Sequence, residues 1–401
     1  MLAAEPDATP ERREVIRVEA GMKARVARTF MDATFTPVKS VSLLHIAAVH
    51  EAAQARERGD LSEVAAWQWV VSEVEAGVRA GNDAALRYLA EHGGYTRSGH
   101  HGGAGGKWED AHNLTVASFL QFSTRAGDPG IHVHNLLLNR VRDATGQYRA
   151  LDTKCLMDAQ HGASAIADRV TEAYLGSHLG VRYCDYDGVR REMVGTTEQM
   201  LEPVSTRSGD ISRVARPLVE AFEARVGRPM NALERRRLLD EVARTTRSRK
   251  DLEHQETLEQ RAARLAAGSM ADAGLVFVQV ADQLLVSTKA GPVQAEPFSP
   301  DSVIKEALVR VAETSAVWTR HQLTRQILTL LPPLGDVTGD QVLLLARQLT
   351  DQALAMDTYG EHEGAIVGAA SSYGAVCVSG SVQAYVPSAD RLTNGQSAFV
   401  R

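Results

Sequence analysis

Apolar and polar residues follow two patterns along the chain, and together they predict a mixture of strands and helices. Alternation with a period of two, bounded by turn residues, predicts strands over 28–36, 113–124, 131–141 and 146–152. Apolar residues repeated every three or four positions predict helices over 38–56, 61–92 and 153–179. The segment "VRYCDYDGVRREMVG" is expected to form a hairpin that turns at Asp187 and Gly188.

The second half of the chain is expected to be mainly helical. The pattern predicts a charged helical stretch over 197–268 and then a short β segment over 270–299. A pair of helices should follow over 301–356, interrupted only by "LPPLGD", and residues 357–401 have a weak pattern. Earlier in the chain, the glycine-rich segment 99–108 predicts a loop or a hairpin connection.

Composition limits the classes of protein to consider. With 401 residues, of which 44% are hydrophobic, the chain can bury a large core. The formal net charge of −6 gives no overall basic field, so contacts with nucleic acid would come from local clusters. The cysteines have no CxxC spacing, which excludes a disulfide framework and a thiolate zinc site. We find no phosphate-binding loop, signal peptide or membrane-spanning run, and we expect a cytoplasmic protein without membrane contact.

The segment "GDPGIHVHNLLLN" places two histidines one residue apart on a predicted strand. His132 and His134 should project from one face of this strand, while Ile131 and Val133 project from the other. The short turn "RAGDPG" should pair the strand with the preceding one in antiparallel orientation, which brings Gln121 to the same point. Its amide oxygen is a hard, neutral ligand that suits Mg²⁺ or Mn²⁺ better than Zn²⁺. The alternative interpretation is two histidines on the solvated face of an edge strand.

Four longer segments occur in a fixed order: "DATFTPVKSVSLL" (32–44), "YLAEHGGYTRSGH" (88–100), "STRAGDPGIHVHNLLLNRV" (123–141) and the stretch from "GQYRALD" to "GVRY" (146–183). In this order and at these intervals they resemble the TrwC/TraI-type (MobF) conjugative relaxases of the HUH endonuclease superfamily. The resemblance covers most of residues 28–265. It implies an α+β fold, with an HUH-type palm of antiparallel β-sheet and packed helices, followed by a smaller, mainly helical domain.

In that family three histidines hold a divalent metal ion, and the resemblance places two of them on His132 and His134. The third position is occupied by Gln121, so the chain departs from the usual cluster. Asp32 matches an acidic residue that helps to deprotonate the nucleophile or orients a ligand histidine. Its alternative interpretation is a cap at the start of a strand. The metal neutralises charge on the scissile phosphate of single-stranded DNA, and a tyrosine attacks the phosphorus.

The nucleophilic tyrosines of the family lie near the N-terminus, before the segment that begins at Asp32. Residues 1–31 contain no tyrosine, and the first one in the sequence is Tyr88. We therefore expect no nucleophilic tyrosine in this chain, with Tyr95 as the alternative. The sequence is interpreted either as an N-terminally truncated relaxase, which we favour, or as a variant that uses the metal site for another purpose.

The resemblance also predicts domains and partners. Residues 1–268 would form a relaxase domain that lacks its tyrosine-bearing strand, 269–356 a helical spacer resembling the region before a helicase, and 357–401 a divergent tail. The expected partners are single-stranded DNA at a transfer origin and other relaxosome proteins. Ordinary solvated charges are the alternative interpretation for the four residues predicted to contact DNA, which are Lys39, Arg125, Arg140 and Arg142.

Three functions remain open from the sequence. The first is metal-dependent, site- and strand-specific binding and nicking of transfer-origin DNA by transesterification, with nicking lost if the tyrosine is absent. The second is DNA binding without catalysis. The third takes His132, His134 and Asp32 as the two-histidine-one-carboxylate site of a metal oxygenase, which the long helices disfavour. A second metal site at His100, His101 and His112 is not expected, because histidines in glycine-rich loops seldom ligate.

Overall fold

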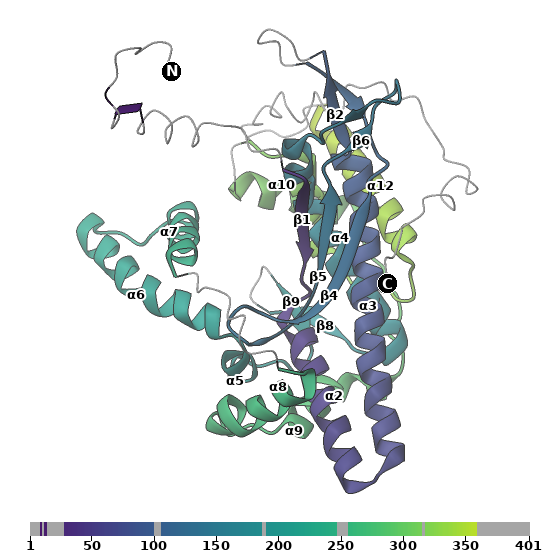
Figure 1. Ribbon diagram of the computed structural model, residues 1–401, viewed down its shortest axis with the longest axis vertical. Helices are drawn as coiled ribbons and strands as arrows, with labels where there is room; N and C mark the ends of the chain where they lie inside the picture. The colour runs from purple at the N-terminus through teal and green to yellow at the C-terminus, as the bar shows by residue number, and fades with distance from the viewer. Residues whose placement is uncertain are drawn as a thin grey trace.

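The computed structural model describes residues 28–99, 106–186, 190–246, 256–314 and 317–358, together with Thr9 and Arg12–Arg13. These residues form an α+β fold in which a small antiparallel sheet lies against long helices (Figure 1). The fold class expected from the sequence is therefore confirmed. No helix in this part of the chain has both the length and the hydropathy needed to cross a bilayer.

A three-stranded antiparallel sheet lies at the centre of the fold, with the strand order β1-β5-β4. Its strands are β1 (Phe30–Phe35), β4 (Val116–Ser123) and β5 (Pro129–Leu138). The short connection between β4 and β5 makes them antiparallel neighbours, as its length predicts. Along β5 buried residues alternate with half-exposed ones, so the inner face packs on the helices and the outer face stays open.

Three long helices pack against the sheet and one another: α2 (Lys39–Arg58), α3 (Leu61–Gly93) and α4 (Thr153–Leu179). All three lie where the periodicity predicts them. The Asp60 and Asp152 side chains accept backbone N–H groups in the first turns of α3 and α4, which fixes where these helices begin. Helices α3 and α4 approach closely because of glycine: a Cβ on Gly81 would lie 2.5 Å from the Ala167 carbonyl oxygen.

Three short hairpins complete the β structure: β2 (Tyr95–Ser98) with β3 (Lys107–Asp110), β6 (Val141–Arg142) with β7 (Tyr148–Arg149), and β8 (Tyr183–Asp185) with β9 (Arg191–Met193). The pairing of β2 with β3 confirms the hairpin connection predicted for the glycine-rich segment, whose residues 100–105 lie outside the described residues. The β8–β9 hairpin is also confirmed, although its expected turn residues, Asp187 and Gly188, lie outside them as well.

The helical character predicted for 197–268 is confirmed over most of the part of that range that the structure describes. Its elements are α5 (Glu198–Leu201), η2 (Glu202–Val204), α6 (Thr206–Val226), α7 (Ala232–Thr245), α8 (Leu258–Leu265) and the π-helical turn η3 (Ala266–Met270). Helices α6 and α7 extend away from the rest of the protein as an arm (Figure 1). Among the arm side chains that the structure describes, only Ala215 and Val242 are buried, so the arm has little core of its own.

The β segment predicted over 270–299 is wrong. The structure has helix α9 (Phe277–Leu284) and the 3₁₀ turn η4 (Val286–Ala290) in its place. The buried side chains of α9 have helical spacing and belong to the hydrophobic cluster around α2: Phe277, Val280, Ala281 and Leu284. Burial of this stripe overrides the strand preference of the β-branched residues in the segment.

The pair of helices predicted over 301–356 is also wrong, because the structure divides this range into three: α10 (Pro300–Thr314), α11 (Arg320–Leu330) and α12 (Gly339–Thr358). The break at "LPPLGD" is confirmed. The additional break precedes α11, where the side chains of Thr319 and Gln322 each accept the other's backbone N–H in a capping box. These helices share one hydrophobic cluster with α3 and α4, so they pack directly on the body of the protein.

Candidate functional site

His132 and His134 lie side by side on the outer face of β5. Their ring centroids are 4.9 Å apart, and their Nε2 atoms are separated by only 3.2 Å. The strand register places Gln121 of β4 opposite His132, and it places Thr34 of β1 and Phe119 of β4 on either side of His134. The structure thus brings together the two histidines and the glutamine that alternation along the strands assigns to one face.

Hydrogen bonds determine the tautomer of each imidazole. His132 Nδ1 lies 2.7 Å from the carbonyl oxygen of Gly130, which can only accept, so Nδ1 carries the proton. His134 Nδ1 lies 2.8 Å from Asp32 Oδ2, and an ionised carboxylate also only accepts. When both rings are neutral, their Nε2 lone pairs therefore face each other across 3.2 Å. A cation between the two nitrogens would offset the repulsion of these lone pairs.

Asp32 holds His134 from the neighbouring strand β1. Thr34 Oγ1 donates to Asp32 Oδ1 over 3.2 Å and also lies 3.0 Å from His134 Nδ1. Because Asp32 contacts Nδ1, it lies on the opposite side of the ring from Nε2 and orients the imidazole. Among the described residues, no three side chains of histidine, cysteine, aspartate or glutamate are arranged to hold one metal ion. This geometry counts against the two-histidine-one-carboxylate site of a metal oxygenase.

A buried amide fixes the strand beneath the histidines. Asn135 is fully buried, and its Nδ2 donates to Asn82 Oδ1 over 2.7 Å and to the Ala33 carbonyl oxygen over 2.9 Å. Its Oδ1 accepts from Ser118 Oγ over 2.6 Å. Asn135 therefore ties β5 to β1, β4 and α3 at one point. A buried polar group that is fully hydrogen-bonded specifies one arrangement of its neighbours, and here it fixes the strand register.

The turn that precedes β5 is held by two other elements. Lys39 Nζ donates to the Pro129 carbonyl oxygen over 2.7 Å, and Thr206 of α6 donates to the buried Asp128 over 2.6 Å. Burial lowers the pKa of Lys39, while the charges of Asp128 and Glu192 oppose this shift. The structure thus places the Lys39 ammonium, which the sequence predicts as a DNA contact, against the backbone of the turn.

The three arginines predicted to contact DNA are exposed. Arg125 lies in the turn before β5. Arg140 follows the strand and donates to the Asn139 carbonyl oxygen over 2.9 Å, and the Arg142 guanidinium lies 5.1 Å from the centre of the Tyr148 ring. The arginines therefore flank β5 at its two ends, with the histidine pair between them along the strand.

Burial raises the pKa of the two buried tyrosines among the described residues, Tyr88 and Tyr183. The Tyr88 hydroxyl lies 2.9 Å from His321 Nδ1, and burial raises the pKa of Tyr88 to about 12. Burial also raises the pKa of Tyr183 well above its usual value. A phenol with a raised pKa is harder to convert to the attacking phenolate, so neither is suited to be a nucleophile. Tyr95, the alternative nucleophile, begins β2 and is half-buried, with its ring edge-on to His112 at 5.6 Å between centroids.

The second metal site considered from the sequence is not supported by the residues that can be placed. His100 and His101 lie outside the described residues. His112 Nδ1 lies 2.7 Å from the Ala90 carbonyl oxygen, and its Nε2 lies 3.8 Å from a carboxylate oxygen of Asp110. His112 thus interacts with residues of α3 and β3.

One side chain of the outer face, Phe119, was not predicted from the sequence. Phe119 is 49% exposed and lies directly opposite His134. An exposed aromatic ring beside polar side chains offers a flat surface on which another ring can stack. Alternation along "SFLQFST" places Phe119 on the same face as Gln121, so the signal was present in the sequence.

A comparison with protein families matches residues 6–268 to the TrwC relaxases, and the chain belongs to this family. No curated protein matches the chain.

Three solved structures of conjugative relaxase TrwC in complex with oriT DNA are similar to the chain. The copper-bound complex is 20% identical, with 67% of this chain and 83% of that chain covered and a TM-score of 0.41. A metal-free complex is 21% identical, with 67% and 85% covered and a TM-score of 0.40. A metal-bound complex is 22% identical, with 63% and 78% covered and a TM-score of 0.40.

Proposed function

We propose that the protein binds single-stranded DNA at a transfer origin and holds one phosphodiester at a divalent metal ion on His132 and His134. One observation carries the proposal. The Nε2 atoms of the two imidazoles are 3.2 Å apart, and the hydrogen bonds at both Nδ1 atoms leave the Nε2 lone pairs available to a ligand. Such a pair attracts a cation, and a phosphate oxygen is a natural further ligand for a divalent ion.

The donor set fits a metal ion. Metal–nitrogen distances in proteins are about 2.0–2.1 Å, so two nitrogens 3.2 Å apart subtend about 100° at an ion between them. Gln121, opposite His132, would add a neutral amide oxygen, which favours Mg²⁺ or Mn²⁺. A bound divalent ion would supply positive charge to the oxygens of the scissile phosphate.

Asp32 has a positioning role in this proposal. Its carboxylate accepts the Nδ1 proton of His134, which fixes the ring orientation and the tautomer that presents Nε2 to a metal ion. Thr34 donates to the other carboxylate oxygen and so holds Asp32 in place.

The strand of DNA would run across the outer face of the sheet. Phe119, exposed beside His134, would stack on a base next to the bound phosphate. The exposed Arg125, Arg140 and Arg142 would bind phosphates on either side of it. Lys39 would act mainly by holding the turn before β5, because its ammonium donates to Pro129.

Strand cleavage requires a nucleophile in addition to the metal. Residues 1–87 of the sequence contain no tyrosine, and Tyr88 is buried. We therefore expect a chain of this sequence to bind transfer-origin DNA without forming a phosphotyrosine adduct. DNA binding without catalysis is thus the second candidate function, and Tyr95 is the residue to test if an adduct forms.

The proposal also covers the domain boundaries of the protein and its location in the cell. Residues 1–268 would be the relaxase domain, 269–356 a helical spacer packed on it through α10–α12, and 357–401 a divergent tail. The protein would act in the cytoplasm, together with other relaxosome proteins, as one component of plasmid mobilisation by conjugation.

The metal site can be tested by titrating Mn²⁺ into the protein in a calorimeter. Replacement of His132 or His134 by alanine should weaken Mn²⁺ binding by more than about 100-fold, because each substitution removes a ligand. His112→Ala, which removes an exposed histidine elsewhere, is the matched control and should bind Mn²⁺ normally. Unchanged Mn²⁺ binding by the double variant at 132 and 134 would refute the metal site.

The DNA function can be tested with a labelled single-stranded oligonucleotide that carries the transfer origin. Fluorescence anisotropy should show binding that is stronger with Mn²⁺ than with a chelator, and Phe119→Ala should weaken it by about 5- to 100-fold. Denaturing electrophoresis of the same samples detects a covalent adduct. An adduct that disappears in Tyr95→Phe would contradict the expected absence of nicking and identify the nucleophile. Metal-independent binding of equal strength would contradict the proposed grip on the phosphate.

A further inference from the structure

The start of β5, which carries His132, has less support from neighbouring strands than the rest of β5 has. The pairing of β1 with β5 ends where Phe35 lies opposite Val133. The pairing of β4 with β5 continues further, but its register shifts between Gln121, the partner of His132, and Ser123. The position of the His132 ring therefore depends on what else holds the start of the strand.

The first turn of α2 supplies this support. Lys39 Nζ donates to the Pro129 carbonyl oxygen over 2.7 Å, and the buried Ser42 hydroxyl accepts the Ile131 N–H over 3.1 Å. These two backbone groups lie on either side of the carbonyl oxygen that accepts the Nδ1 proton of His132. The first turn of α2 thus fixes the short backbone segment that orients one imidazole of the pair.

The start of α2 is in turn held by Glu192 of strand β9. Glu192 is 1% exposed, and its Oε2 accepts the backbone N–H of Ser40 over 3.0 Å and the Ser40 hydroxyl over 2.5 Å. The first N–H groups of a helix have no partner within the helix, and a carboxylate near them is also stabilised by the helix dipole. The N-cap residue of α2 is Val38, which provides no side-chain cap. The capping group therefore comes from a residue 152 positions away.

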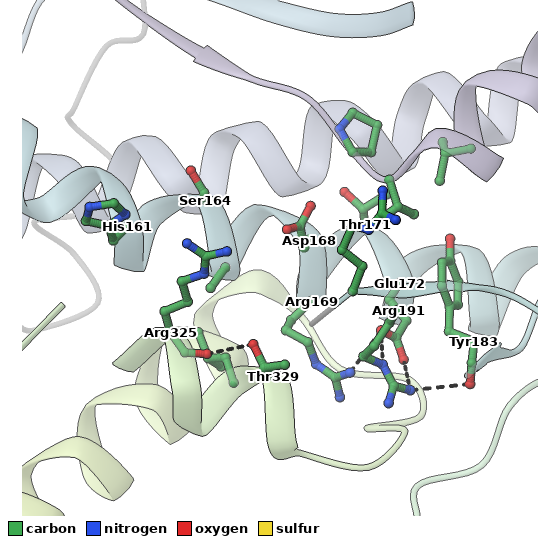
Figure 2. A pocket seen from close by; sticks show the side chains of 16 residues that line it. His161, Ser164, Asp168, Arg169, Thr171, Glu172, Tyr183, Arg191, Arg325 and Thr329 are labelled. Carbon is green, nitrogen blue, oxygen red and sulfur yellow. Dashed lines mark hydrogen bonds and ion pairs between the residues drawn. The ribbon is translucent and has the colours of Figure 1, made fainter. Parts of the chain in front are cut away.

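The strand that carries Glu192 is itself anchored. Its neighbour Arg191 donates to both carboxylate oxygens of Glu172 on α4, over 2.9 and 3.1 Å (Figure 2). Glu172 also accepts from Arg169, which donates to the Pro332 carbonyl oxygen in the connection that follows α11. Bidentate pairs of arginine with a carboxylate have a defined geometry. Glu192 therefore extends from a strand that is fixed to the body of the protein.

Stability alone does not account for a glutamate at this position. The second carboxylate oxygen of Glu192, Oε1, is buried and makes no hydrogen bond to any residue that the structure describes. A buried oxygen without a hydrogen-bond partner costs free energy, whereas a serine or aspartate at the N-cap position caps a helix without that cost. A local cap, however, would not connect β9 to the first turn of α2.

We propose that Glu192 is a positioning residue for the histidine pair and that it acts through the first turn of α2. Its carboxylate fixes where α2 begins relative to β9. Lys39 and Ser42 of that turn then determine where β5 begins, and with it the position of the His132 ring. The proposal rests on the proposed metal site, because the site gives the position of the ring its importance.

The two imidazoles are held by different elements, so a change at Glu192 should affect only one of them. His134 is oriented by Asp32 of β1, whereas His132 is oriented by the start of its own strand. Loss of the cap would therefore move His132 relative to His134. A metal ion bound by both rings needs both nitrogens at about 2.0–2.1 Å, so this displacement weakens its binding.

The test compares Mn²⁺ affinity, measured by calorimetry on the full chain, with the free energy of unfolding. Glu192→Ala should weaken Mn²⁺ binding by about 5- to 10-fold, less than loss of a direct partner of a ligand, because Glu192 acts through further contacts. Glu192→Gln keeps an oxygen that accepts from Ser40 and should restore most of this affinity. Thr350→Val is the matched control. It removes an equally buried hydroxyl, bonded to Thr324 between α11 and α12, so it should lower stability without changing Mn²⁺ binding.

A second measurement needs no metal. In NMR spectra of the protein with ¹⁵N-labelled histidine, Glu192→Ala should shift the ring signals of His132 and leave those of His134 in place, and Thr350→Val should shift neither. If the unsubstituted protein binds no Mn²⁺, the metal site is refuted, and these signals still decide the role of Glu192. Ser42→Ala removes the acceptor of the Ile131 N–H while keeping the cap. It should also shift the His132 signals, and it decides the question if Glu192→Ala does not fold.

Three results would overturn the proposal. The first is an unchanged His132 signal in folded Glu192→Ala or, if that variant does not fold, in Ser42→Ala. The second is equal weakening of Mn²⁺ binding in Thr350→Val, which would make the effect one of general stability. The third is Mn²⁺ binding by Glu192→Gln as weak as that by Glu192→Ala, since the hydrogen bonds to Ser40 would then not be what positions α2.

Discussion

The histidine pair on the sheet and the interface between α4 and α11 are both rich in polar side chains, but their surroundings differ. The pair lies on an open face, and the residues that orient it come from the adjacent strand and from its own strand. Along the interface, by contrast, Arg169 is 3% exposed and bonds to elements that are far apart in the sequence. Substitutions at the open site should therefore change ligand binding, whereas substitutions at the interface should change the free energy of unfolding.

The largest effect on stability is expected when Glu172 is replaced by alanine. The substitution leaves the buried Arg169 without its carboxylate partner, and an uncompensated buried charge costs about 3–5 kcal/mol of unfolding free energy. Urea denaturation followed by circular dichroism measures this loss. The matched control is Glu306→Ala, which breaks a surface pair with Arg310 on α10 and should cost less than about 1 kcal/mol. Equal losses of unfolding free energy in the two variants would contradict the prediction that a buried ion pair contributes more to stability than an exposed one.

The second prediction concerns acid stability at the contact between α11 and α3. Tyr88 of α3 is bonded to His321 of α11, and burial lowers the pKa of His321 to about 4 from its usual 6.5. The unfolded chain therefore takes up a proton below pH 6.5, whereas the folded chain does so only near pH 4. The contribution of His321 to the free energy of unfolding is therefore fully present above pH 6.5. It is lost as the pH falls toward 4, and the loss is at most about 3 kcal/mol.

Urea denaturation between pH 7 and pH 4 measures the slope of this loss. His321→Gln keeps a hydrogen-bond acceptor for Tyr88 but does not titrate, so the slope should become smaller. It should not vanish, because burial also lowers the pKa of His92 on α3, whose ring packs on that of His321. His112→Gln, at an exposed position, should leave the slope as it is. An unchanged slope in His321→Gln would contradict the prediction.

The histidine site could be predicted from the sequence because its main residues lie on neighbouring strands, whereas the interface between α4 and α11 joins elements that are far apart in the sequence. His132, His134 and Gln121 lie on two strands joined by a short turn, so alternation and turn length are enough to place them on one face. Asp32 comes from a strand that precedes them by some hundred positions, and only the family resemblance indicated its role. The contact between Lys39 and the Pro129 carbonyl oxygen was not predicted. Lys39 is the first residue of α2, and the local sequence does not indicate that its side chain faces a turn some ninety residues later.

The cavity of about 300 Å³ between α4, the β8–β9 hairpin and α11 could not be predicted, because its lining residues come together only after α11 has packed on α4. Their positions depend on the tertiary arrangement of separate elements. The helix α9 was mispredicted for the same reason. Its buried residues Phe277 and Val280 favour a helix because they pack against α2, which is far away in the sequence. Local patterns thus predicted most of the strands and long helices, while contacts between distant elements determined the rest.

The third prediction tests whether the open site can change in affinity without a change in stability. Asp32→Asn removes the negative charge that holds the Nδ1 proton of His134, so Mn²⁺ affinity should fall by about 10- to 100-fold. Asp32 is 44% exposed, and the unfolding free energy should therefore change by less than about 1 kcal/mol. Calorimetry and urea denaturation on the same preparation give both quantities. Asp110→Asn, beside the exposed His112, is the control and should change neither.

The smallest effect is expected at Gln121, where a histidine would complete a cluster of three imidazoles on the open face. Gln121→His should tighten Zn²⁺ or Ni²⁺ binding by about 10-fold and reduce the preference for Mn²⁺, because imidazole suits these metals better than an amide oxygen does. Competition titration with a chromogenic chelator measures the change, and Gln199→His on the exposed surface is the control. The gain requires that the side chain at 121 reaches the point where the two Nε2 atoms converge, as its position opposite His132 implies. If the affinity for Zn²⁺ does not rise, residue 121 is not a ligand, and the open site consists of two histidines whose remaining ligands come from the DNA and from water.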